Sequence, residues 1–65
     1  MGERAKIPVL IRHWIEHNES HAEEYRRWAD IAREEGLERV ESLILEAADR
    51  IRSANEKLKE ALEDL

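Results

Sequence analysis

Cysteine is absent from this chain of 65 residues, and the sequence contains only two glycines and one proline. Without cysteine, the chain can form no disulfide, no thiolate metal site and no thiol nucleophile. Scarce glycine and proline argue against a fold rich in loops and favour long helices. A domain of this size buries only about 60% of its unfolded surface, so it needs support. We expect that support to be a metal ion, a partner chain, or both.

Clustered positive charge and long apolar runs are also missing. The formal net charge is -5, although charged residues make up 42% of the chain. This balance argues against nucleic acid, which requires a clustered basic surface. The longest strongly apolar run, residues 9–11, is far shorter than the roughly 18 residues of a membrane span. The first residues have no apolar signal region, so we expect a cytoplasmic protein.

The feature that is present throughout is a heptad pattern, with alternating steps of four and three residues. In the first half, the pattern comprises Ile7, Ile11, Trp14, Asn18, His21, Tyr25, Trp28 and Ala32. In the second half, it comprises Leu37, Val40, Ile44, Ala47, Ile51, Ala54, Leu58, Ala61 and Leu65. This spacing predicts two amphipathic helices that pack along these positions, with the three aromatic residues in the core.

Gly36 lies between the two patterns, where a left-handed glycine is expected to end the first helix. We therefore predict an all-α fold, an antiparallel two-helix hairpin in a single domain of residues 1–65. The first helix should span about residues 8–35, with Pro8 in its first turn, and the second about residues 37–64. Folding at Gly36 places Asn18 opposite Ala54 and Asn55.

Further apolar residues flank both patterns and make them wider than one partner helix can cover. They are Leu10, Ile15, Ala22, Ala29, Ile31, Leu43, Leu45, Ala48 and Leu62. We therefore expect two hairpins to form a homodimer with the architecture of a four-helix bundle.

Three histidines form a stripe on the first helix. His13, His17 and His21 are spaced by four residues, which places them on one side of a helix. Glu16 and Glu24 each follow a histidine by three residues. Imidazoles at i and i+4 can bind one divalent ion, and these carboxylates could complete the site. The pattern predicts a site for nickel or zinc formed mainly by His17 and His21.

The same histidines have two other interpretations. The rotation of the helix predicts that His21 is buried, that His17 flanks the interface and that His13 lies at its rim. A buried His21 could join Asn18 and Asn55 in a polar core layer that fixes the register of the helices. A role in sensing pH is the third interpretation.

The segment from His13 to Asn18, with His21 and Trp28 beyond it, resembles a small uncharacterised helical domain of archaea and anaerobic bacteria. That domain is associated with nickel-binding proteins of carbon monoxide dehydrogenase maturation, to which it can be attached. The resemblance implies nickel or another divalent ion, with His13, His17 and His21 as matching positions. The β-rich nickel-binding part of such proteins, with its cysteine, is not in this chain. The resemblance therefore also allows a helical appendage that dimerises a larger parent protein.

Enzyme signatures are lacking. No glutamate is followed by histidine three residues later, as di-iron bundles require, and no zinc-protease motif or phosphate-binding loop occurs. We therefore expect a metal-binding module without catalysis, acting with a parent protein or a metal-handling partner. The alternative is a homodimerisation or protein-interaction module whose histidines are structural.

Overall fold

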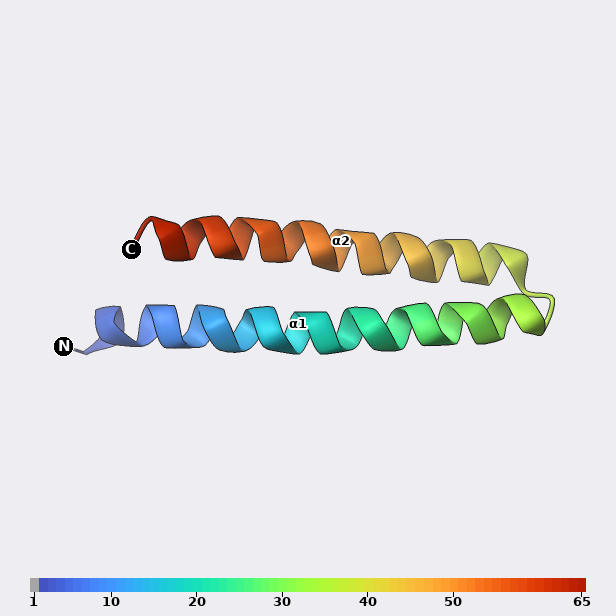
Figure 1. Ribbon diagram of the computed structural model, residues 1–65, viewed down its shortest axis with the longest axis horizontal. Helices are drawn as coiled ribbons and strands as arrows, with labels where there is room; N and C mark the ends of the chain where they lie inside the picture. Colours follow the sequence, from blue (N-terminus) through green and yellow to red (C-terminus); the bar gives the residue numbers. More distant parts are fainter. Residues whose placement is uncertain (1) are drawn as a thin grey trace.

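The computed structural model describes residues 2–65 and is helical apart from the turn and the chain ends. Helix α1 spans Glu3–Glu34, and helix α2 spans Glu38–Glu63. The two helices lie antiparallel and side by side along their whole length, so both chain ends lie at the same end (Figure 1). The hairpin measures 52 × 15 × 12 Å. The prediction of an all-α antiparallel hairpin is confirmed; Met1 lies outside the described residues.

Gly36 forms the turn between the helices in a left-handed conformation, with φ of 79°. The N–H of Leu37 donates to the carbonyl of Ala32 at 2.9 Å, and the N–H of Gly36 donates to that of Arg33 at 3.0 Å. These two bonds form a Schellman motif, which satisfies carbonyls that would otherwise lack partners at the helix end. A residue with a Cβ is strained at this φ, so glycine ends α1 where the sequence predicted it.

Pro8 lies inside α1, not in its first turn as predicted, because the helix begins at Glu3. A proline at this depth removes one backbone hydrogen bond, that to the carbonyl four residues earlier. The preceding turn has its own support, since Lys6 and Glu3 form an ion pair of 3.5 Å.

The core between the helices consists mainly of small and branched side chains. Its buried members are Ile11, Ile15, Ala22, Ala29, Ala32, Ala48 and Asn55. Ala29 is 0% exposed and Ala48 is 1% exposed, which indicates that the backbones approach closely at these alanines.

The prediction that Trp14 and Trp28 pack between the helices is wrong. Trp14 is 47% exposed and Trp28 is 53% exposed. The buried residues Ile15 and Ala29 each follow a tryptophan by one position, and neighbouring helix positions point 100° apart. Each helix is therefore rotated so that its smaller residues face the partner helix, and the tryptophans lie on one side of the hairpin.

A pair of asparagines crosses the core near the middle of the hairpin. The side-chain amide N–H of Asn18 donates to the side-chain oxygen Oδ1 of Asn55 at 2.9 Å. The side-chain amide N–H of Asn55 donates to the backbone carbonyl of Ile15 at 3.1 Å. Asn55 is buried, and within residues 2–65 no buried side-chain polar atom lacks a partner. The sequence register that set Asn18 opposite Asn55 is therefore correct.

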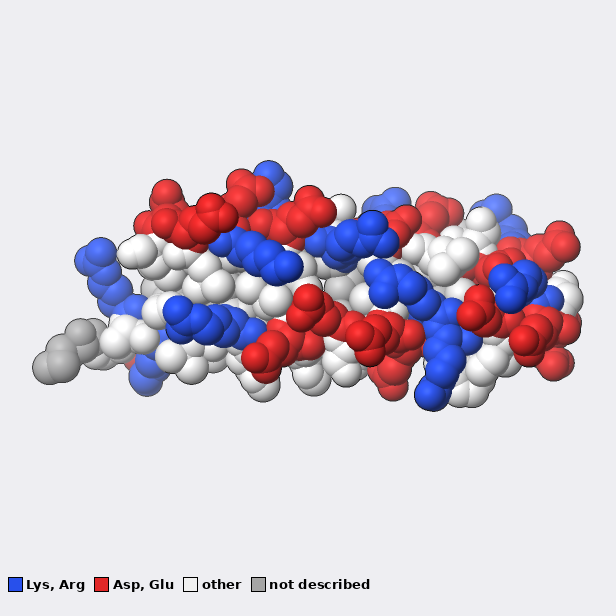
Figure 2. All heavy atoms as spheres, in the orientation of Figure 1, with Lys and Arg blue, Asp and Glu red and all other residues white. Residues whose placement is uncertain are grey.

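Charged side chains cover one broad face of the hairpin, where acidic and basic groups alternate over both helices (Figure 2). A shallow groove with a mostly charged lining runs between the helices, bordered by Glu19, Glu23, Arg26, Arg52, Glu56 and Lys59. Near the turn, Arg33 bridges the helices through an ion pair of 3.5 Å with Glu41. Neither described helix has the length of apolar sequence needed to cross a membrane.

Candidate metal centre

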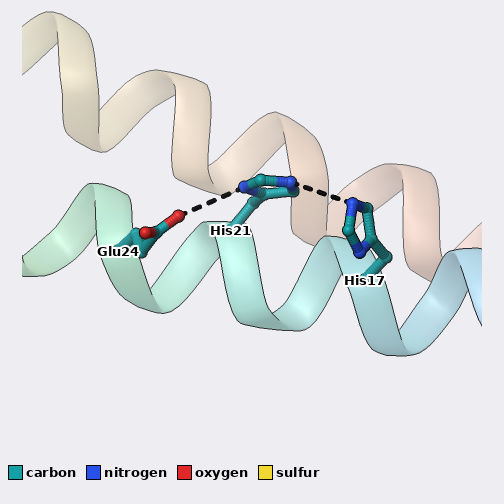
Figure 3. Close-up of polar contacts among 3 residues, drawn as sticks. All are labelled: His17, His21 and Glu24. Carbon is teal, nitrogen blue, oxygen red and sulfur yellow. Dashed lines mark hydrogen bonds and ion pairs between the residues drawn. The ribbon is translucent and has the colours of Figure 1, made fainter.

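His17 and His21 lie one turn apart on α1 with their rings turned toward each other (Figure 3). Their Nε2 atoms are 3.2 Å apart, and the rings meet edge to face with centroids 4.6 Å apart. The i, i+4 spacing places the two Cβ atoms on one side of the helix, and the side-chain rotamers bring the nitrogens together. The two imidazole nitrogens therefore lie within hydrogen-bonding distance of each other on the outside of α1.

Glu24 contacts the other ring nitrogen of His21, Nδ1. Its carboxylate Oε1 lies 3.3 Å from the Nδ1 of His21, one turn further along the same side of α1 (Figure 3). A carboxylate at Nδ1 favours the tautomer with a proton there, because only an N–H can donate to it. With a proton on Nδ1, the Nε2 of His21 carries a lone pair that accepts the hydrogen bond from the Nε2–H of His17. A metal ion that binds both nitrogens would replace that proton.

His13 and Glu16, the other two predicted ligands, do not join this cluster. The ring of His13 stacks on that of His17, with centroids 5.9 Å apart and planes inclined by 16°. Glu16 directly precedes His17, so its side chain points about 100° away around the helix. Of the five predicted residues, the structure gathers His17, His21 and Glu24.

The prediction that His21 is buried is wrong. Its side chain is 46% exposed, and its hydrogen bonds go to His17 and Glu24 along the same helix. The rotation that exposes the tryptophans also turns His21 out of the core, where Ala22 replaces it. The polar layer inside the hairpin therefore consists of Asn18 and Asn55 without a histidine.

The separation of the two nitrogens fits a shared metal ion. Ligands at 2.0–2.1 Å from a tetrahedral zinc ion lie about 3.3 Å from each other, close to the observed 3.2 Å. The ligand set of one chain is nevertheless incomplete. Within residues 2–65, no three histidine or acidic side chains are arranged to hold an ion. A tetrahedral ion at this point would have two ligands from the chain and two open positions.

The histidines share their side of the hairpin with exposed apolar residues, which we call the aromatic–histidine face. On α1 it comprises the exposed residues Ile7, Leu10, Trp14, His17, His21 and Trp28. On α2 it comprises the exposed residues Val40, Leu43 and Ala54 and the half-buried Ala47 and Ala61. A groove of ≈ 530 Å³ lies on this face, bordered by Tyr25, Trp28, Val40, Leu43, Ile44 and Ala47. Glu24 also borders the groove, which therefore begins beside the histidine pair. Sequence reasoning placed Trp28 and Val40 in the hairpin core and so missed this face.

The fold and the side-chain contacts define a small helical hairpin with an exposed pair of histidines on α1. Residues 7–65 match the family described as "Domain of unknown function (DUF8180)", and the chain belongs to that family. An uncharacterised protein of Archaeoglobus fulgidus is 37% identical over 60 residues, which cover 92% of this chain and 84% of that protein. No solved structure matches the chain.

Proposed function

We propose that this hairpin is a cytoplasmic module that binds a divalent transition metal, nickel or zinc, through the Nε2 atoms of His17 and His21. The observation that carries the proposal is their separation of 3.2 Å. The module holds the ion without catalysis and passes it to a parent or partner protein.

Two features of the structure support metal binding over a structural role for the histidines. The hydrogen-bonding needs of the core are met by Asn18 and Asn55, so the fold does not require His17 or His21 as polar core residues. Glu24 occupies the position from which carboxylates commonly orient metal-binding histidines. The resemblance to nickel-associated proteins points the same way. The family match and the archaeal relative do not bear on nickel, so that association stays a prediction.

Thermal unfolding with and without Zn²⁺ or Ni²⁺ tests the proposal. An ion that binds only the folded chain adds about 2.7 kcal/mol at a hundred times its dissociation constant. For a chain of this size, that gain raises the melting temperature by more than about 10 °C. A variant with His17→Ala and His21→Ala should lose the gain and keep its metal-free stability within about 0.5 kcal/mol, because both side chains are exposed.

His13→Ala is the matched control, since it removes a neighbouring exposed histidine that does not converge with the other two. It should retain the full response to metal. An unaltered chain whose melting temperature ignores both ions would rule out the proposed function, as would an equal loss of response in His13→Ala and in the double variant.

A second candidate function is self-association or protein interaction without metal. The observation that favours it is the exposure of large apolar side chains, among them Trp28 at 53% and Leu43 at 48%. Contiguous exposed apolar surface on a small protein commonly marks an interaction site. Under this hypothesis, the chain associates through the aromatic–histidine face, and its assembly and melting temperature are indifferent to added metal.

A further inference from the structure

We infer that the metal site is completed by a second copy of this chain, so that one ion lies on a two-fold axis between two aromatic–histidine faces and is held by His17 and His21 of both copies. This inference rests on the proposed function. It adds the identity of the partner, the ligand set and the symmetry of the assembly.

One chain supplies only half of a closed tetrahedral ligand set. The pair of histidines supplies two nitrogens, and the described part of the chain offers no third ligand nearby. A closed tetrahedral site needs four ligands, and zinc in such sites is held by nitrogen or sulfur donors. A second copy supplies two further imidazoles with the same separation. Two-fold symmetry then gives four nitrogens, in two symmetry-related pairs, without any other protein.

A single hairpin also exposes more surface than a compact chain of its mass. The chain exposes 5355 Å². A compact monomer of 7.7 kDa exposes about 4,300 Å² by the usual scaling of surface with mass. The excess, about 1,000 Å², exceeds the roughly 800 Å² that each partner buries in a stable interface of standard size. One copy of this hairpin therefore has enough surplus surface for a dimer.

The two histidines lie near the middle of the rod. Helix α1 has 32 residues from Glu3 to Glu34, so its midpoint falls between Asn18 and Glu19. The midpoint between His17 and His21 is also Glu19. A two-fold axis through the ion and perpendicular to the helices sets His17 of one copy opposite His21 of the other. Because this axis passes through the middle of α1, the two α1 helices overlap along their whole length.

The alternative stacking, with α1 of one copy on α2 of the other, does not complete the site. All three histidines lie on α1, so α2 would present none to the ion. The ligand set therefore selects the arrangement in which α1 packs antiparallel on α1, and α2 on α2.

The composition of α2 on this face suits such contact. Ala47, Ala54 and Ala61 recur at intervals of seven residues and form a stripe of small side chains. The bond between Asn18 and Asn55 sets the register, which places Ala54 beside the level of Glu19 and hence of the axis. Two α2 helices can approach closely where alanines face each other. In the pair, Ala54 should lie close to its own symmetry copy.

Cobalt titration combined with sedimentation tests the shared site, because tetrahedral Co²⁺ has strong visible absorption. We expect a dimer that saturates at one Co²⁺ per two chains with a tetrahedral spectrum. Saturation at one Co²⁺ per chain in a monomer would overturn the shared site and leave the proposed function standing. A chain that binds none of Co²⁺, Zn²⁺ and Ni²⁺ would overturn both.

Single cysteines test the geometry, since the chain has none of its own. Ala54→Cys, loaded with Zn²⁺ and mildly oxidised, should form a disulfide-linked dimer, because disulfides require Cα atoms within about 7 Å. Ser53→Cys is the matched control: it is the neighbouring residue of α2, points about 100° away and should stay largely monomeric under the same oxidation. Equal cross-linking of the two variants, or none in Ala54→Cys, would overturn the proposed symmetry.

Discussion

Two polar clusters occupy the same stretch of α1, and they differ in what surrounds them. Asn18 reaches across the core to buried Asn55, and every polar atom in this pair that is buried has a partner within the hairpin. His17 and His21 lie one position before Asn18 and three positions after it, yet they are exposed and bond only to each other and to Glu24. Rotation around one helix therefore separates a cluster that is complete within the chain from one that is not.

This difference separates structure from function. A buried polar pair fixes the register and the relative orientation of the two helices, because any shift of one helix along the other would leave its donors unpaired. An exposed pair of imidazoles contributes little to folding, since water can replace each bond. Its nitrogens remain available to an ion or to another chain. The two clusters can accordingly be altered independently, and the consequences of each change should fall on different measurements.

The largest effect on stability should come from Asn55→Ala. This change removes the acceptor of Asn18 and the donor to Ile15, and it leaves a gap in the core. Leaving a buried polar group without a partner costs about 1–3 kcal/mol, so we expect a loss of about 2 kcal/mol in the free energy of unfolding. Urea denaturation measures it. The gain in melting temperature on adding Zn²⁺ should stay unchanged. A variant that still folds but loses this gain would show that the asparagine and histidine clusters are not independent.

Glu24→Gln should produce a smaller effect, confined to the histidine cluster. The amide can still contact His21 but lacks the charge that favours a proton on Nδ1. Removing such supporting partners commonly weakens metal binding 10- to 100-fold, so we expect a loss of about 1.4 kcal/mol or somewhat more in binding free energy. Competition with a chromophoric chelator measures the affinity. Glu23→Gln, with the same change of charge one position away, should bind metal as the unaltered chain does.

The smallest net effect should come from replacing both asparagines, as Asn18→Leu with Asn55→Leu. Removing both partners leaves no unpaired group, and apolar replacements of a buried polar pair are often neutral, so stability should change by less than about 1 kcal/mol. Chemical denaturation of the double and single variants gives the coupling between the two residues. If the double variant were as unstable as Asn55→Ala, the asparagine pair would contribute more to stability than the mutual pairing of its own polar groups.

Several elements of the fold follow from the sequence because each rests on a strong local rule. The heptad spacing predicted two helices. Gly36 predicted the turn between them, and its left-handed φ of 79° in the structure is the conformation expected of a glycine that ends a helix. Counting from that turn also placed Asn18 opposite Asn55. Register in an antiparallel pair depends only on where the chain reverses, which a single glycine fixed.

The rotation of each helix about its own axis, which decides the side that faces the partner helix, could not be predicted in the same way. Trp14 and Trp28 lie in one apolar stripe of α1, and Ile15, Ala22 and Ala29 lie in the next. Both stripes fit a heptad, so periodicity alone does not choose between them. The alanine stripe faces α2 because small side chains let the backbones come close, as the full burial of Ala29 indicates. Fitting the tryptophans into a two-helix core would have held the helices apart.

The same rotation decided how much of the metal site was foreseeable. The spacing of His17, His21 and Glu24 placed them along one side of α1, as the structure does. Their exposure was not foreseen, because it depends on which stripe faces α2. The approach of the two Nε2 atoms to 3.2 Å depends on side-chain rotamers, which sequence spacing does not specify.

The reversal of the chain at Gly36 has a consequence for anything fused to this hairpin. Because α2 runs back along most of the length of α1, the chain returns to the end where it started, and both termini leave the rod there (Figure 1). In the antiparallel dimer that we propose, the termini of the second copy leave at the opposite end of a rod 52 Å long. Domains joined to the two copies would be held apart by this distance, with the pair of hairpins acting as a rigid spacer between them.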